Sequence, residues 1–341
     1  HRGSHLRGGK ARLWGDKMLV RFWGTRGSLP VAATASIVQE KVAQALLAAS
    51  GRSFASIDEA RSFARNDLDF ATSGTFGGAT TCVEIEAGDP DAGDAYIVCD
   101  MGSGLRGFGL DAMRRCAQGH ARVYHFFMSH LHWDHIMGFP FFVPAFDPNA
   151  HIIIHSGHED AETALRRQQE EISFPVAFDW LRAKIEFRTL KTGETYQIGA
   201  VQVELMEQHH SHSSFGYRFT DAAGKVAVFS TDSEHKMEKM EGEADVEHFF
   251  READLVICDT MYSLADSVSM KEDWGHSSNI VAIDLCHGGR AKRLALFHHE
   301  PVYSDADIAR MHAESVRYEE LTREHAPLEV LCAYDGLEVS L

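Results

Sequence analysis

Four side chains that can bind a metal lie within six residues, at His130, His132, Asp134 and His135. Neutral imidazole and carboxylate are the ligands that zinc and related metals prefer. The cluster follows an apolar, aromatic run at residues 123–128, which predicts a buried strand. On an extended segment His130, His132 and Asp134 point to one side, because side chains alternate along a strand. His135 adds a second point beside them, so the spacing favours two metals over one.

Other residues with suitable chemistry follow further predicted strands. Asp232 comes after the apolar run at residues 225–230, where a carboxylate can bridge two cations, although Asp is also a common helix N-cap. His276 precedes Ser277 and Ser278 at the predicted start of a helix, where unpaired backbone N–H groups attract anions. An imidazole there suits contact with a phosphoryl oxygen. The alternative is that a serine caps the helix and His276 is merely adjacent.

The first metal needs a third histidine from a separate strand end. The segment after the predicted strand at residues 201–206 offers three candidates, His209, His210 and His212. On an extended segment His210 and His212 face the same way, so the residues alone leave the choice open.

The pattern His-x-His-x-Asp-His after a strand resembles the metallo-β-lactamase superfamily. Segments at residues 24–30, 77–82 and 100–104 are similar to the opening strands of its ribonuclease Z and cyclic-phosphodiesterase branch. The resemblance implies an α/β fold, an αββα four-layer sandwich of two mixed sheets with helices outside and metals at one edge.

The resemblance also implies a complete ligand set. A Phe-Gly-Tyr-Arg segment favours His210 as the third ligand of the first metal, and a Leu-x-Leu-x-His strand end matches the last metal histidine at His298. Asp232 would bridge the two metals. The first metal would take His130, His132 and His210, and the second would take Asp134, His135 and His298.

The same resemblance assigns catalytic and substrate-binding roles. His276 would assist the leaving oxygen, and Asp259 would orient the His276 ring. Asp134 is predicted to take part in catalysis as well as to bind the second metal. Ribonuclease Z-like enzymes carry Glu and His where this chain has Asp259 and Cys258, so the shorter acid places its charge differently. We predict that Ser277 and Arg26 bind the substrate.

The composition and net charge of the chain limit the kinds of partner that it can bind. The chain has 341 residues, 44% hydrophobic and 24% charged, which is typical of a globular protein with a large core. Its 50 acidic and 33 basic residues give a net charge of −17, which argues against a long nucleic acid as a partner, because Lys and Arg bind phosphate backbones.

No apolar run of membrane-spanning length follows Met18, and the six cysteines form no Cys-x-x-Cys pair. We expect a cytoplasmic protein with reduced thiols and no membrane contact.

The domain organisation is predicted as one metallo-hydrolase domain over residues 18–341. Residues 1–17 resemble an expression-tag remnant and are excluded from the fold argument. A helical insertion is expected at about residues 31–72, with Ser56 and Glu59 as a capping box for its second helix. The insertion could be a lid, a dimer contact or a surface ornament, so a homodimer remains open. The chain is expected to end in a strand pair around Gly336.

These features predict a metal-dependent phosphodiesterase that hydrolyses a small, cyclic phosphodiester of nucleotide or phosphoribosyl type with a metal-bridging hydroxide. The expected cofactors are two divalent metal ions, zinc first and manganese or iron as alternatives. A thioester, lactone or lactam hydrolase would use the same metals. A tRNA 3′-processing endonuclease is disfavoured by charge and by the absence of a tRNA-gripping arm between the predicted strands at residues 151–155 and 184–187. A non-catalytic binding module would be expected to lack at least one metal-binding residue, whereas all seven metal-ligand positions are filled in this chain.

Overall fold

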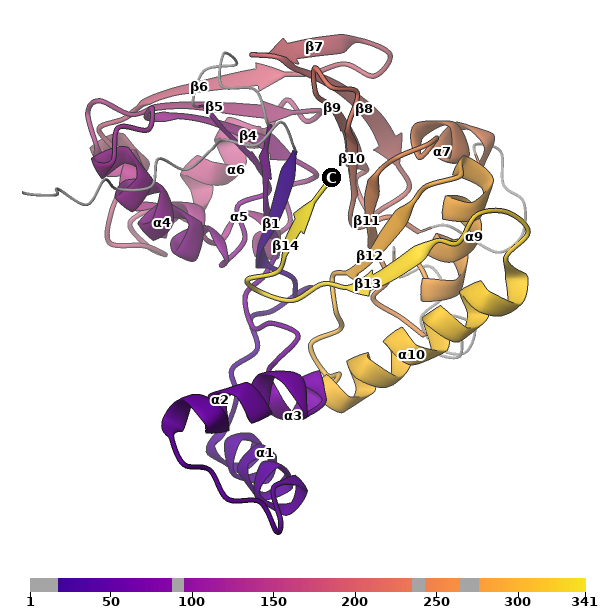
Figure 1. Cartoon of the computed structure of the whole chain (residues 1–341). Helices are drawn as coiled ribbons and strands as arrows, with labels where there is room; N and C mark the ends of the chain where they lie inside the picture. The colour runs from indigo at the N-terminus through magenta and orange to yellow at the C-terminus, as the bar shows by residue number, and fades with distance from the viewer. Residues whose placement is uncertain (1–17, 88–94, 235–242, 264–275) are drawn as a thin grey trace, which may run out of the picture.

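The computed structural model describes residues 18–87, 95–234, 243–263 and 276–341. Two seven-stranded sheets make up most of it, in the orders β14-β1-β2-β3-β4-β5-β6 and β13-β12-β11-β10-β9-β8-β7 (Figure 1). The first sheet contains β1 (Leu19–Gly24), β2 (Cys82–Glu86), β3 (Tyr96–Cys99), β4 (Val123–Met128), β5 (His151–Ser156), β6 (Lys184–Thr189) and β14 (Glu338–Ser340). The second contains β7 (Thr195–Ile198), β8 (Val201–Gln208), β9 (Ser214–Thr220), β10 (Val226–Ser230), β11 (Leu255–Asp259), β12 (Arg293–Phe297) and β13 (Glu329–Cys332).

The two sheets pack face to face through a shared apolar core. Phe22 of β1 and Phe127 of β4 meet Phe229 of β10 and Phe297 of β12 in this core. Burial of such large side chains, at about 25 cal/mol for each Å² removed from water, is the main force that holds the sheets together.

Helices cover the outer face of each sheet. On the first sheet Phe108 of α4 (Leu105–Ala117) packs against Tyr124 of β4. On the second sheet Leu285 of α9 (Asn279–Gly289) packs in the core that contains Val256 of β11. The layers are therefore helix, sheet, sheet and helix, which confirms the predicted αββα sandwich. The remaining helical segments are α5 (Trp133–Ile136), α6 (Ala161–Gln168), α7 (Glu243–Phe249), α10 (Asp305–Thr322) and the short η1 (Phe139–Phe141), η2 (Val143–Phe146) and η3 (Phe178–Trp180).

Parallel strands bring the candidate site together. Strands β3 to β6 are parallel in one sheet, and β10 to β13 are parallel in the other. Since the carboxyl ends of parallel strands lie at the same edge, the residues that follow β3, β4, β10, β11 and β12 converge at one edge of the sandwich.

The end of the chain differs from the prediction. Residues around Gly336 do not join a hairpin, because β13 pairs with β12 in the second sheet and β14 pairs with β1 in the first. The Asp335 carboxylate accepts hydrogen bonds from the backbone N–H groups of Gly78 and Ala79, so the crossing also fastens the loop before β2.

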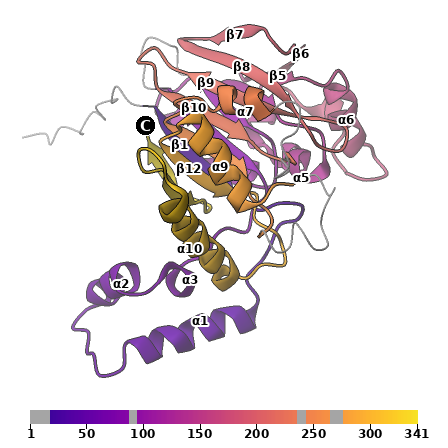
Figure 2. The same cartoon turned by 90° about the vertical axis from the view of Figure 1, so that its right-hand side faces the viewer.

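The helical insertion forms α1 (Ala35–Ala48), α2 (Ile57–Asn66) and α3 (Phe70–Ser73), close to the expected ranges. Ser56 caps α2 by accepting the Glu59 N–H, as predicted, but the Glu59 carboxylate returns to the Ala55 N–H instead of to Ser56. In two perpendicular views α1 and α2 stand away from the sheets, and α3 lies beside the start of α10 (Figures 1 and 2). The predicted tag at residues 1–17 lies outside the described residues.

Two expectations concern the chain as a whole. All six cysteines are buried and free. Within the described residues, no helix has both the length and the apolar character needed to cross a membrane.

Candidate metal centre

The run of ligands after β4 leaves the strand and turns into a helix. His132 has extended backbone and serves as the N-cap residue of α5, so Asp134 and His135 lie in a helical turn. The His135 N–H donates to the His132 carbonyl at 3.0 Å. The expected extended segment is therefore wrong beyond His132, and the turn, instead of strand alternation, directs Asp134 and His135 inward.

The first cluster joins the two sheets. Nitrogen atoms of His130, His132 and His210 all lie within 4.8 Å of one another. His132 Nδ1 and His210 Nε2 are 3.3 Å apart. His212 is exposed, and neither it nor His209 belongs to a metal-competent group among the described residues. Of the three candidates, the structure brings His210 to the cluster.

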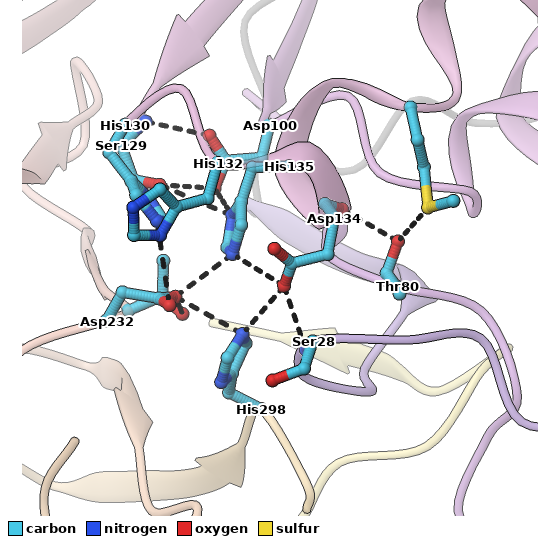
Figure 3. A network of polar contacts seen from close by, with 12 residues as sticks. Ser28, Thr80, Asp100, Ser129, His130, His132, Asp134, His135, Asp232 and His298 are labelled. Carbon is cyan, nitrogen blue, oxygen red and sulfur yellow. Dashed lines mark hydrogen bonds and ion pairs between the residues drawn. The ribbon is translucent and has the colours of Figure 1, made fainter. Parts of the chain in front are cut away.

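The second cluster consists of Asp134, His135 and His298, whose ligand atoms also lie within 4.8 Å of one another. Asp134 Oδ2 is 3.2 Å from His135 Nε2 and 3.4 Å from His298 Nε2. Figure 3 shows these side chains pointing toward a common centre from two segments of the chain, the helical turn α5 and the end of β12.

Asp232 lies between the two clusters (Figure 3). Its carboxylate is 3.7 Å from His130 Nε2 in the first cluster, and 3.2 Å and 3.3 Å from the Nε2 atoms of His135 and His298 in the second. Asp232 has a left-handed backbone with φ 49°, and His298 has φ 62°. Such strained conformations concentrate at functional sites, where the surrounding structure holds them.

Asp100, which received no role in the sequence analysis, positions the second cluster. It follows β3, and its carboxylate accepts the His135 Nδ1–H at 2.7 Å. It also accepts the backbone N–H and the hydroxyl of Ser129, at 2.7 Å and 2.6 Å. Burial raises the pKa of Asp100, although His135 and Ser129 oppose this effect. The available signal was an Asp directly after an apolar strand, at the start of Asp-Met-Gly-Ser-Gly.

His276 borders the centre from the second sheet. Its Nδ1 atom is 2.7 Å from Asp259 Oδ2 and 4.0 Å from Asp232 Oδ1, and its ring lies 5.1 Å from that of His298. Burial opposes a charge on His276, but the carboxylates of Asp259, Asp232 and Asp134 outweigh burial and raise its pKa to about 9. His276 also forms a group within 4.8 Å with Asp232 and His298, so it lies at the edge of the second cluster.

Arg26 and Ser277 make structural contacts. The Arg26 side chain is buried and donates to the backbone carbonyls of Gly77, Glu300 and Tyr303. The Ser277 hydroxyl donates to the Ser233 carbonyl at 2.5 Å. These contacts hold loops around the site, and substrate binding by Arg26 and Ser277 stays a prediction.

The loop after β1 reaches the centre through two neighbours of Arg26. The Ser28 backbone N–H donates to Asp134 Oδ2 at 2.9 Å. A Cβ atom at Gly27 would lie 2.6 Å from the His298 ring, so glycine permits the loop to pack directly on this ligand. The sequence marked the loop as a glycine-containing turn but did not identify these two contacts.

The residues fit divalent metal ions. Among the described residues, the buried Nε2 atoms of His130, His135 and His298 make no well-formed hydrogen bond and face only the carboxylate oxygens of Asp134 and Asp232, as expected for nitrogens that bind a metal. Burial disfavours a charge on His135, but Asp232, Asp134 and Asp100 outweigh burial and raise its pKa well above the usual value. Burial likewise opposes ionisation of Asp232, but the imidazoles of His135, His298 and His130 lower its pKa. Metal binding to such a site releases protons.

Comparisons with known proteins agree with this architecture. The family model described as "Beta-lactamase superfamily domain" matches residues 95–299, more than half of the chain. A search of curated proteins finds no match. Yeast PDE1 has a similar structure, with 14% identity, a TM-score of 0.61 and coverage of 95% of this chain and 99% of that chain.

Two further solved structures are similar over nearly their whole length. A diphosphatase from the PhnP family is 17% identical, with a TM-score of 0.55 and coverage of 95% of this chain and 98% of that chain. The short form of human tRNase Z is 17% identical, with a TM-score of 0.53 and coverage of 94% and 98%. At these identities the likeness shows the fold.

Proposed function

Because this chain belongs to the metallo-β-lactamase superfamily, we propose that it is a dinuclear metal-dependent hydrolase of small phosphodiesters, with cyclic nucleotides or phosphoribosyl cyclic phosphates as the substrate class. The observation that carries the proposal is the position of Asp232 between two three-residue clusters, with His276 at their edge. One cluster supplies three imidazoles, and the other supplies two imidazoles and a carboxylate. Such mixed nitrogen and oxygen ligands suit zinc first, with manganese or iron as alternatives.

The clusters would hold two cations, which when bound lower the pKa of water and neutralise charge on a phosphoryl group. His130, His132 and His210 would hold one, and Asp134, His135 and His298 the other. Asp232 would contact both. Asp100 fixes the tautomer of His135 through Nδ1, which leaves Nε2 for the metal.

His276 is placed to serve the leaving oxygen. Asp259 engages its Nδ1 atom, so Nε2 is the nitrogen available to a substrate. The Asp259 carboxylate, which is not one of the proposed metal ligands, raises the pKa of His276 and so favours the protonated ring. A protonated His276 can donate to the oxygen that gains charge as the ester bond breaks, which is general acid assistance.

A small substrate is favoured over tRNA, despite the similar fold of tRNase Z. The net charge of −17 repels a long phosphate backbone. The segment between β5 and β6 contains only α6 and η3 as helices, and its Arg166 is paired with Glu162 and Asp179. This segment offers neither a long arm nor a free row of cations to grip tRNA.

The proposal is tested by measuring hydrolysis of bis(p-nitrophenyl) phosphate, a chromogenic thioester and nitrocefin by metal-stripped protein reloaded with zinc or manganese. We expect phosphodiester turnover that requires metal and falls by about a hundredfold in His276→Ala, the usual scale of lost acid–base assistance. The matched control is His212→Ala, because His212 is exposed and outside the described clusters; its turnover should equal that of the wild type.

Two results would contradict the proposal. Turnover of only the thioester or nitrocefin would assign the protein to thioester or lactam hydrolysis. Phosphodiester turnover that is equal in His276→Ala and His212→Ala would remove His276 from the mechanism.

A further inference from the structure

Within the described residues, helix α1 of the insertion is covered only on the side that faces α3 and the start of α10. It has fourteen residues, and none of them is buried. It contacts α3, which in turn contacts α10, and both views show it standing away from the sheets (Figures 1 and 2). Isolated helices of about 12–15 residues are marginal in water, and most helices in proteins are stabilised by packing of an apolar face. A stable α1 therefore calls for a partner surface.

The two faces of α1 have different surroundings. Ile37, Lys41 and Gln44 face a cavity of about 700 Å³ between the insertion and the start of α10. Lys41 Nζ bonds Asp305 Oδ2 at 2.7 Å, which ties this face to the body of the protein. The other face has nothing comparable in the described structure.

That other face carries an apolar stripe made of Val38, Val42 and Leu46, and the next residue, Leu47, points about 100° further round the helix. The first three follow one another at a spacing of four residues, which places them in a row along the helix. Their exposed fractions rise from 49% at Val38 to 69% at Leu46, and Leu47 is 78% exposed. Contiguous exposed apolar side chains of this kind mark interaction surfaces.

We propose that the α1 stripe is the contact surface of a homodimer, in which two copies of α1 pack antiparallel about a two-fold axis near Val42. A two-fold contact uses the same patch on both copies, so the patch must complement itself. The stripe meets this condition: with Val42 at the axis, Val38 of one copy faces Leu46 of the other.

Charge makes the insertion the surface through which two copies of this acidic chain can meet with the least repulsion. Residues 31–72 contain five acidic and four basic residues, a net charge of −1, whereas the whole chain carries −17. Two copies can therefore meet through the insertion with little repulsion, while contacts between other surfaces bring strongly acidic bodies together. The nearly neutral insertion also lacks the charge that would recruit a charged partner or membrane.

The stripe predicts a weak dimer. A standard interface buries about 800 Å² on each partner, and four exposed side chains supply only a part of that. We expect a dissociation constant of about 1–100 μM, within reach of sedimentation velocity.

The first test follows the sedimentation of the whole chain from about 1 to 200 μM, a range that brackets this constant. The double variant Val42→Glu with Leu46→Glu should remain monomeric throughout. The control is Leu110→Glu on α4, another exposed leucine, which should dimerise like the wild type. Equal circular dichroism and phosphodiester turnover in the variants would show that the fold is intact, since these residues lie outside the metal centre.

The second test locates the axis. All six native cysteines are buried, so Val42→Cys introduces an exposed thiol. Under copper–phenanthroline, which accepts the two electrons as two thiols lose two protons and form a disulfide, Val42→Cys should give a covalent dimer much faster than Leu110→Cys. A wild type that is monomeric at 200 μM, a dimer that survives the double charge substitution, or equal cross-linking of the two cysteine variants would overturn the proposal.

Discussion

The protein contains two aspartate–histidine pairs, one beside each sheet, and their surroundings differ. Asp100 follows β3 and holds His135 Nδ1 at 2.7 Å, while Asp259 ends β11 and holds His276 Nδ1 at the same distance. His135 is fully buried, and its other nitrogen faces Asp134 and Asp232. The His276 side chain is 10% exposed at the edge of the cluster. Under the proposed function, the sealed Asp–His pair would hold a metal, and the pair at the edge of the cluster would donate a proton to the substrate.

The largest effect is expected from Asp232, because it touches both clusters. Asp232→Asn keeps the size of the side chain but removes the negative charge between the two sets of imidazoles. Phosphodiester turnover should fall by more than about a hundredfold, since orienting partners alone are worth about 10–100-fold. Metal content by mass spectrometry should fall as well. Retention of two metals with near-normal turnover would show that Asp232 does not connect the clusters.

Asp100→Asn tests the buried pair. The amide cannot hold His135 as the charged carboxylate does, so metal affinity should fall by about 10–100-fold. Turnover should recover when zinc is added in excess. An unchanged zinc affinity in a competition assay with a chelator would contradict the role assigned to Asp100.

Asp259→Asn tests the pair at the edge of the cluster and is the matched control for Asp100→Asn. Zinc affinity should stay close to that of the wild type, while turnover falls by about 10-fold or more, because His276 loses its orienting and charge-stabilising partner. Excess zinc should not restore the activity. If Asp259→Asn instead loses metal, His276 is a ligand of the second cluster.

The smallest effect concerns a histidine pair away from the centre. His155 Nε2 is 3.0 Å from His125 Nδ1 on neighbouring strands. Burial, with contributions from His125 and Arg188, lowers the pKa of His155 to about 3. Below a pH of about 6.5 the unfolded chain binds a proton that the folded protein refuses, so stability falls as the pH falls, by up to about 1.4 kcal/mol per pH unit.

His155→Asn should therefore weaken the loss of unfolding free energy between pH 7 and pH 5, measured with urea. His151→Asn on the same strand is the control and should keep the pH dependence of the wild type. An identical slope in both variants would contradict the assignment. Because each variant is compared with itself at two pH values, the cost of the substitution cancels.

The sequence predicted those parts of the fold and site that depend on local patterns. The ligands at His130, His132, Asp134 and His135 are dense in sequence because one strand end supplies them all. The single candidate ligands Asp232, His210 and His298 each follow another strand, and the resemblance was needed to select them. The layered fold followed from the same resemblance and from the alternation of strands and helices.

The missed features depend on contacts between distant segments. Asp100 acts through His135, and Ser28 acts through its backbone N–H; the position of Asp100 after a strand was visible in the sequence, but the partner of neither residue was. The chain end also could not be predicted: a turn at Gly336 fits a hairpin locally, but each flanking strand finds a better edge on a different sheet. Likewise, nothing local shows that Arg26 bonds three backbone carbonyls in a buried position.

The most direct test of the dinuclear phosphodiesterase is a zinc titration of metal-stripped protein, with hydrolysis of bis(p-nitrophenyl) phosphate followed at each step. Two clusters joined by Asp232 predict that full turnover is reached only at two equivalents of bound zinc. Full turnover at one equivalent, or no phosphodiester turnover at any zinc level, would contradict the account.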